Sequence, residues 1–310
     1  MIDFEKIYSQ FTSELIGNQK RLELKSALGI YYGVSQDGCL RLSFLSTTPA
    51  PKMESTKLLK VFQGKESEGV YWTCFDLIQA EAKKVYFAFC ANLIDSILDT
   101  LDEREALQIL KKRYITWKTM FRKDIKQGLS REVIQGLFGE LYFIKKQLSK
   151  HYSFADCVKS WSGPDSTSKD FSINDNWFEV KTIGANAVSV KINSITQLSS
   201  KTDGKLVIIK VEKMSPEFTN GESSIEELFK SILAEIKDEA IEGLFLNKIS
   251  SFGVDISDES FTAKFSVKSM NNYIVKEGFP RIQESDIKFS EVCDVSYSLI
   301  VNALKDYLEE

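Results

Sequence analysis

The stretch KDFSINDNWFEVKT, residues 169–182, leaves few alternatives to a β-hairpin. Apolar and polar residues alternate on both sides of Asn174-Asp175-Asn176, a run with turn chemistry. Because alternate side chains of a strand lie on the same face of a sheet, we expect Glu179 and Lys181 on one face and the apolar side chains that flank Glu179 on the other. The segment therefore brings an acid and an amine together on one strand.

The register of this hairpin decides what else lies on that face. With Asp175-Asn176 as the loop, Asp170 lies opposite Lys181 on the neighbouring strand, and a four-residue loop keeps the same register. Two carboxylates and an ammonium group then share one surface. Mg²⁺ is a hard cation that binds carboxylate, water and phosphate oxygens, so this surface suits phosphate-ester hydrolysis. An ordinary cross-strand ion pair on a solvated face is the alternative that the pattern leaves open.

A third carboxylate lies on a predicted helix, residues 131–148, with Ser130 as its N-cap. Glu140 belongs to a helix stripe whose other members are apolar: Val133, Leu137, Ile144 and Leu148. A buried carboxylate is unfavourable unless it is paired or bound to a metal, so Glu140 is a candidate site residue. The alternative is a glutamate at the edge of the stripe that reaches water.

Charge is unevenly distributed along the 310 residues. Residues 111–213 carry 19 basic and 10 acidic side chains, whereas residues 214–310 carry 9 and 19. A basic middle region is expected for a chain that binds a polyanion such as DNA, although lysines that cover the outside of the central elements would produce the same bias. At the start of this region four apolar residues recur at helical spacing and are expected to pack inward: Leu110, Tyr114, Trp117 and Phe121.

Several protein classes are excluded. The best apolar run, residues 85–94, is too short to span a membrane, and the acidic N-terminal segment does not have the pattern of a signal peptide. Five scattered cysteines without CxxC spacing indicate a reducing cytoplasm rather than a disulfide framework or a zinc site. His151 is the only histidine, so a histidine-ligated metal cluster is excluded and a Ser-His or Cys-His hydrolase would have to use that residue.

The remaining elements are read from periodicity and turn signals. A hairpin at Asp37-Gly38, two more strands within residues 69–89 and a helix from residue 91, interrupted near 99–103, are expected in the first third. Further elements are predicted as strands at 187–192 and 205–213, helices at 194–200 and 224–240, and a terminal helix at 298–310.

Three blocks, in this order, resemble the PD-(D/E)XK nuclease superfamily: GLFGELYFI (136–144), WSGPDSTSKDF (161–171) and WFEVKT (177–182). In that superfamily a helix supplies a Glu, one strand an Asp and the next strand the (D/E)-x-K pair. The tail segments YIVKEGFPRI (273–282) and DVSY (294–297) are similar to PD-(D/E)XK-motif proteins encoded beside DNA methyltransferases and ATPases in bacterial restriction and phage-defence operons.

This resemblance implies an α/β (α+β overall) architecture with a restriction-endonuclease-like core, a mixed central sheet flanked by helices, at residues 106–215. A strand-rich N-terminal region (1–105) and an α+β C-terminal extension (216–310) packed on the core complete the expected organisation. The implied activity is a cytoplasmic, Mg²⁺-dependent DNA endonuclease, with Mn²⁺ as a substitute ion. Methyltransferase and ATPase partners are implied, and a homodimer is left open. The alternative is a non-catalytic, nuclease-like subunit that binds DNA or assembles a defence complex, which the acidic C-terminal third suits.

Carried over residue by residue, the resemblance implies that Asp170 and Glu179 bind the metal. It implies that Lys181 is the catalytic lysine and Glu140 an auxiliary acid.

Two further residues are weighed on the same basis. Gln197 is similar to a glutamine that some members place near the scissile phosphate. The literal Pro-Asp of the motif is Pro164-Asp165, five residues before Asp170. Asp170 is preferred because apolar residues around it give strand context, and Asp165 is the alternative ligand.

Overall fold

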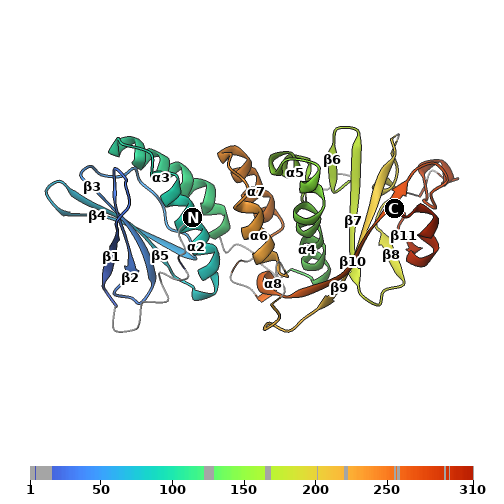
Figure 1. The fold of residues 1–310 in the computed structure, drawn as a ribbon, viewed down its shortest axis with the longest axis horizontal. Helices are drawn as coiled ribbons and strands as arrows, with labels where there is room; N and C mark the ends of the chain where they lie inside the picture. The colour runs from blue at the N-terminus through green and yellow to red at the C-terminus, as the bar shows by residue number, and fades with distance from the viewer. Residues whose placement is uncertain are drawn as a thin grey trace. The chain divides into compact units, whose positions relative to one another are not determined.

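The computed structural model describes residues 4, 16–121, 129–164, 169–200, 202–219, 223–254, 256, 259–289, 291–292 and 294–309. The chain divides into two compact units: unit 1, residues 1–127 with 255–258, and unit 2, residues 128–254 with 259–310. Each unit combines strands with helices (Figure 1), so the mixed α and β architecture expected from the sequence is confirmed.

Unit 1 is built on an antiparallel sheet with the strand order β1-β2-β3-β5-β4. The strands are β1 (Gln19–Leu22), β2 (Gly29–Val34), β3 (Leu40–Ser46), β4 (Leu59–Ser67) and β5 (Val70–Leu77). The turn between β2 and β3 contains Asp37-Gly38, with Gly38 at φ 78°, a conformation that glycine adopts without strain. The hairpin predicted there is confirmed.

Two helices cover one face of this sheet, α2 (Lys83–Asp95) and α3 (Glu103–Lys118), with short 3₁₀ turns η2 (Ala80–Ala82) and η3 (Thr119–Phe121) (Figure 1). The prediction of two strands within residues 69–89 is wrong in its second half, because Lys83 begins α2. This helix is buried over most of its surface, so it shows little periodicity, and its aromatic residues resemble those of a buried strand.

The aromatic stripe of α3 packs inside unit 1, as the spacing predicts. The ring centroids of Phe89 and Trp117 lie 5.9 Å apart, and Trp117 Nε1 donates a hydrogen bond to Asn92 Oδ1 at 3.0 Å. The basic segment that begins at residue 111 therefore belongs, as far as Phe121, to unit 1. The first boundary lies beyond the expected residue 105, because α3 completes the core over the first sheet.

Unit 2 contains a mixed sheet with the strand order β10-β9-β7-β6. These strands are β6 (Phe171–Ile173), β7 (Asn176–Gly184), β9 (Gly204–Lys213) and β10 (Phe265–Val275). β7 and β9 are parallel, and the other two pairs are antiparallel. A separate antiparallel pair joins β8 (Ser189–Ile192) to β11 (Tyr297–Ile300).

The helix α4 (Arg131–Lys146) packs against β7, and Ser130 caps it by accepting a hydrogen bond from Val133 N at 3.4 Å. Gly139 allows this approach, because a Cβ atom added there would lie 1.7 Å from Thr182 Oγ1. The other helices of the unit are η4 (Leu148–Lys150), α5 (Phe154–Ser160), η5 (Ile195–Gln197), α6 (Ile225–Leu233), α7 (Glu239–Ser251), α8 (Glu259–Thr262), η6 (Glu284–Asp286) and η7 (Val301–Tyr307).

The last third of the chain is an integral part of unit 2. β10 pairs with β9 along its whole length, and α6 lies beside α4 (Figure 1). The helix expected at 224–240 ends at Leu233, and α7 starts separately after Asp238, whose side chain caps it. The terminal helix expected at 298–310 begins instead as β11 and continues as a 3₁₀ helix, because these residues pair with β8.

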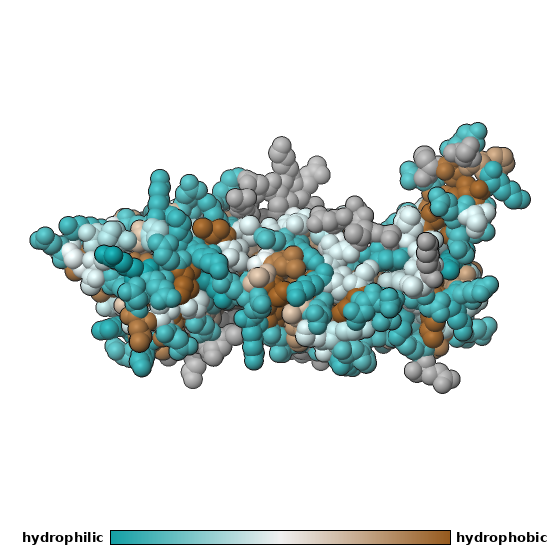
Figure 2. Space-filling model, turned by 90° about the horizontal axis from the view of Figure 1, so that it is seen from above, coloured by the Kyte–Doolittle hydropathy of each residue, from teal (hydrophilic) through white to brown (hydrophobic). Residues whose placement is uncertain are grey.

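The surface in Figure 2 is mostly hydrophilic, and its apolar residues gather in small separate patches. None of the helices in the described parts of the chain combines the length and apolar character that a membrane crossing requires.

Candidate active site

The β6–β7 hairpin has a register two residues away from the expected one. Its loop is Asn174-Asp175, and Ser172 pairs with Trp177 rather than with Glu179. Asn174 adopts φ 53°, the positive value that the first residue of such a tight loop requires and that asparagine tolerates. A shift of two residues leaves every side chain on its predicted face, but it sets Asp170 level with Glu179 instead of Lys181.

Glu179 is the most buried of the four predicted residues, at 1% exposure. Its Oε1 lies 2.7 Å from Lys181 Nζ, the only ion pair that the structure gives it within the described residues. Its Oε2 is buried and accepts no hydrogen bond from the described parts of the chain. A buried carboxylate oxygen without a partner is unfavourable, so this arrangement calls for a further positive group.

Asp170 immediately precedes β6 and is held by the backbone of the next strand. Its Oδ2 accepts a hydrogen bond from Val180 N at 2.7 Å. This bond fixes the carboxylate beside β7, next to Glu179. The structure thus brings Asp170, Glu179 and Lys181 together, as the sequence predicts, through a contact that the sequence did not reveal.

Glu140 approaches this group from α4. It is half-buried, and its Oε2 accepts a hydrogen bond from Trp161 Nε1 at 2.6 Å. The stripe that predicted its position is buried at Leu137, Ile144 and Leu148, whereas Val133 is 40% exposed near the helix start. Glu140 therefore lies where an apolar stripe meets a polar site.

The three carboxylates influence one another electrostatically. The pKa of Glu179 is raised to about 8, chiefly by burial and then by the charge of Asp170, while Lys181 opposes the rise. Burial likewise raises the pKa of Asp170, against the opposing charge of Lys181. Burial raises the pKa of Glu140 well above its ordinary value, with Asp170 as the next largest cause. Groups with strongly raised pKa values that perturb one another are typical of functional sites.

Two residues that the sequence analysis missed support the site. Lys169 is buried, and its Nζ donates to the carbonyl oxygens of Thr196, Gln197 and Ser199 at 2.6, 2.6 and 2.9 Å. Trp161 holds Glu140. A lysine next to a candidate ligand and a tryptophan before a Gly-Pro turn are visible in the sequence, but their contacts depend on segments that are distant in the chain.

The lysine contact brings the η5 turn beside the site. Gln197 contacts Lys169 through its backbone carbonyl, and its side-chain Oε1 accepts a hydrogen bond from Asn193 N at 2.8 Å. Gln197 thus lies against Lys169, the residue before Asp170, with its side-chain oxygen already engaged. Asp165, the alternative ligand, lies outside the described residues.

The donor set fits a hard divalent ion. Asp170 and Glu179 supply carboxylate oxygens, and Mg²⁺ is commonly held by one or two carboxylates together with water and substrate phosphate oxygens. Across the described ranges no three His, Cys, Asp or Glu side chains are arranged as a metal-binding cluster, so Glu140 is not placed as a third direct ligand. The buried Oε2 of Glu179 is the oxygen that a cation would satisfy.

A carboxylate–carboxylate–lysine group on a mixed α/β sheet, with a glutamate from the adjacent helix, is the arrangement of the PD-(D/E)XK class. The family model described as "Putative PD-(D/E)XK family member (DUF4420)" matches residues 5–302. The chain belongs to this family. Neither a curated protein nor a solved structure matches it.

Proposed function

We propose that this protein is a metal-dependent DNA endonuclease that hydrolyses phosphodiester bonds. The observation that carries the proposal is Glu179, a carboxylate at 1% exposure beside Asp170, whose Oε1 is paired with Lys181 and whose Oε2 has neither an ion pair nor a hydrogen bond in the described residues. An acid that only stabilised the fold would have both oxygens satisfied. Membership of a PD-(D/E)XK family supports the reaction class.

Asp170 and Glu179 would hold the divalent ion, Mg²⁺ or, as a substitute, Mn²⁺. When bound, such an ion neutralises charge on the scissile phosphate and lowers the pKa of its water. Lys181 donates hydrogen bonds from its ammonium group to the attacking water and to the phosphate oxygens, and its charge stabilises the transition state. Glu140, held by Trp161, acts as an auxiliary acid beside this group.

The proposed substrate rests on the charge of the chain, and the proposed biological setting rests on the resemblance to proteins of restriction and phage-defence operons. The basic charge of residues 111–213 favours a DNA backbone as the partner, since phosphate contacts supply most of the affinity that does not depend on sequence. We place the enzyme in a bacterial restriction or phage-defence system, with a methyltransferase and an ATPase as partners. Cleavage of both DNA strands by one site per chain would favour a homodimer.

The first test is metal binding, measured by calorimetry with Mn²⁺ on the full-length protein. Asp170→Asn and Glu179→Gln should each weaken binding at least tenfold. Asp175→Asn is the matched control, because it makes the same chemical change at an exposed position of the same hairpin. Equal binding by the wild type and all three variants would refute the assignment of the ligands.

The second test is cleavage of plasmid DNA with Mg²⁺, alone and together with the methyltransferase and ATPase. We expect nicked or linear product with the wild type and with Asp175→Asn, and none with Glu179→Gln. If the assembled complex binds DNA without cleaving it, the alternative of a non-catalytic, nuclease-like subunit replaces the endonuclease.

A further inference from the structure

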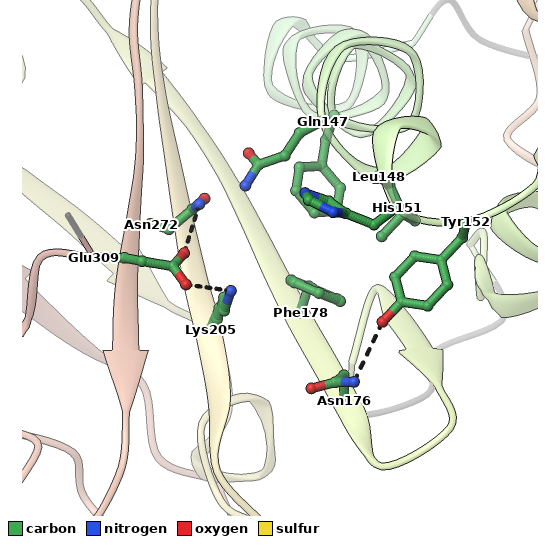
Figure 3. Close-up of a pocket in the computed structure, with 10 residues that line it drawn as sticks. Gln147, Leu148, His151, Tyr152, Asn176, Phe178, Lys205, Asn272 and Glu309 are labelled. Carbon is green, nitrogen blue, oxygen red and sulfur yellow. Dashed lines mark hydrogen bonds and ion pairs between the residues drawn. The ribbon is translucent and has the colours of Figure 1, made fainter.

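Unit 2 contains a pocket of about 430 Å³ on the α4 side of its sheet (Figure 3). Phe178 points into it, whereas Glu179, the next residue of β7, points to the opposite face of the strand. None of the three carboxylates described above lines the pocket, so it is separate from their site. Most of its wall is polar or aromatic, and it is lined by Phe143, Gln147, Leu148, His151, Tyr152, Asn176, Phe178, Lys205, Asn272 and Glu309.

Aromatic rings form one side of the pocket. Phe143 and Phe178 pack with their centroids 5.3 Å apart, and both are buried. The rings of His151 and Tyr152 lie on the loop after α4 and face the same space (Figure 3). These flat surfaces come from three separate elements, so only the fold brings them together and no local sequence motif predicts the pocket.

Amide groups with unused hydrogen-bonding capacity face these rings. The side chain of Gln147 points into the pocket, and no hydrogen bond joins it to the other residues drawn in Figure 3. Asn272 donates from Nδ2 to Glu309 Oε2 at 2.9 Å, but its Oδ1 is buried and has no hydrogen-bond partner in the described residues. Asn176 donates to the hydroxyl of Tyr152 at 3.3 Å, which leaves the hydroxyl proton available.

The charges on the pocket wall compensate each other. Lys205 Nζ lies 2.5 Å from Glu309 Oε1, and Glu309 is held in place because its backbone N–H donates to Asn272 O at 2.9 Å. A site for a free phosphate would present uncompensated positive charge. The Lys205–Glu309 pair therefore favours an uncharged, flat ligand with polar edges.

We propose that this pocket binds a nucleobase. A base is flat enough to lie against the Phe178 ring, and glutamine and asparagine amides match the donor and acceptor pattern of base edges. The base is supplied either by a free nucleotide or by an unstacked position of a nucleic-acid strand. Binding does not require hydrolysis, so the proposal stands or falls separately from the endonuclease activity.

The test uses the full-length protein in EDTA, so that no cleavage occurs. AMP, GMP, CMP and dTMP are titrated by calorimetry, with ribose 5-phosphate as the ligand that lacks a base. A single-stranded oligonucleotide that contains 2-aminopurine is titrated by fluorescence, because that base reports on stacking. The variants are Gln147→Leu and Tyr152→Phe, and the matched control is Gln36→Leu, an exposed glutamine of unit 1.

We expect at least one nucleotide or the oligonucleotide to bind, with at least tenfold weaker binding in Gln147→Leu and unchanged binding in Gln36→Leu. Tyr152→Phe, which removes a single oxygen, should retain the fold by circular dichroism and weaken binding about threefold. Nucleotide binding identifies a free-nucleotide site, and binding of the oligonucleotide alone identifies a strand base. Equal binding of ribose 5-phosphate, or no binding of any base-containing ligand, would overturn the proposal.

Discussion

Each unit has a buried carboxylate on a strand next to a basic side chain, but the two carboxylates differ in the partners of their oxygens. In unit 1, Asp76 on β5 lies directly opposite Arg41 on β3, whose Nε and Nη2 donate to its two oxygens, both at 2.6 Å. In unit 2, Glu179 has one ion pair among the described residues, from Oε1 to Lys181 at 2.7 Å, and its Oε2 has no partner there. Both acids are 1% exposed.

The two carboxylates are equally buried but differ in how many of their oxygens have a partner. This difference distinguishes a structural ion pair from a candidate binding site. The two N–H groups of Arg41 match the two oxygens of Asp76, so this pair needs nothing more. Lys181 offers a single ammonium group, and Glu140 and Asp170 add negative charge beside Glu179. A site of this composition becomes favourable when a cation binds, which is why we locate function in unit 2.

The largest effect is expected from Lys181→Met. In the proposed mechanism this change removes the charge that stabilises the transition state, so the rate of DNA cleavage should fall by about 10²–10³-fold. The control is Lys191→Met, which removes an exposed lysine from β8 and should leave the rate within about twofold of the wild type, as expected for an exposed side chain. Equal cleavage rates in the Lys181→Met and Lys191→Met variants would contradict the assignment of the Lys181–Glu179 pair to a catalytic site.

In unit 1 the expected effect is on stability. Arg41→Met leaves Asp76 buried without its partner, and the free energy of unfolding should fall by about 3 kcal/mol. Lys60→Met removes the exposed pair with Asp37, 3.4 Å long, and should change it by less than about 1 kcal/mol. Urea denaturation checks both. A loss for Arg41→Met no larger than for Lys60→Met would contradict a structural role for the buried pair.

The site of unit 2 also depends on the close approach of α4 to β7. The Arg41–Asp76 pair of unit 1 joins two strands of one sheet and needs no such approach of a helix. Gly139→Ala places a methyl group 1.7 Å from Thr182 Oγ1, so the free energy of unfolding should fall by about 2 kcal/mol. Gly136→Ala, three residues earlier, meets no atom within 4 Å and should stabilise the helix by up to about 1 kcal/mol. The same urea experiment compares them, and a destabilised Gly136→Ala would refute the packing argument.

The remaining effect is a pH dependence, which changes the stability gradually rather than in one step. The folded protein holds the Glu179 proton up to a pKa of about 8, above the ordinary value of 4.5, so it binds that proton more tightly than the unfolded chain. The stability linked to this proton is fully present below pH 4.5 and is lost as the pH rises towards 8. Without metal ions, we expect the free energy of unfolding to fall by about 1 kcal/mol per pH unit between these limits.

Glu179→Gln should make this slope shallower, because glutamine does not titrate, whereas Glu140 and Asp170, whose pKa values are also raised, keep their share of it. The variant and the wild type are compared by urea denaturation at pH 5, 6, 7 and 8 in EDTA. Parallel pH profiles would show that Glu179 is not the buried acid responsible.

Local patterns in the sequence account for much of the fold and of the candidate site. Alternation along residues 176–184 placed Glu179 and Lys181 on one strand face, and helical spacing placed Glu140 among buried residues, with Ser130 as the cap. These predictions succeeded because they depend on the period of a strand or a helix, which neighbouring residues set.

Other features lay outside the reach of local patterns. The hairpin register was displaced by two residues because Asn174 accepts a positive φ, and α2 was mistaken for a strand because burial on most sides erased its periodicity. The contacts of Lys169 with the η5 turn, and of Trp161 with Glu140, join segments that are 21 to 30 residues apart.

Which residue types line a strand face or a helix stripe is thus readable from the order of the amino acids, and so is the chemistry that they offer to a cation. Whether a carboxylate oxygen is left without a partner depends on the packing of elements that are distant in the chain. Burial and the proximity of other charges raise the pKa of Glu179 to about 8, and both arise only when α4, β6 and β7 meet. The nucleobase pocket has the same origin, because its rings and amides converge from separate helices and strands.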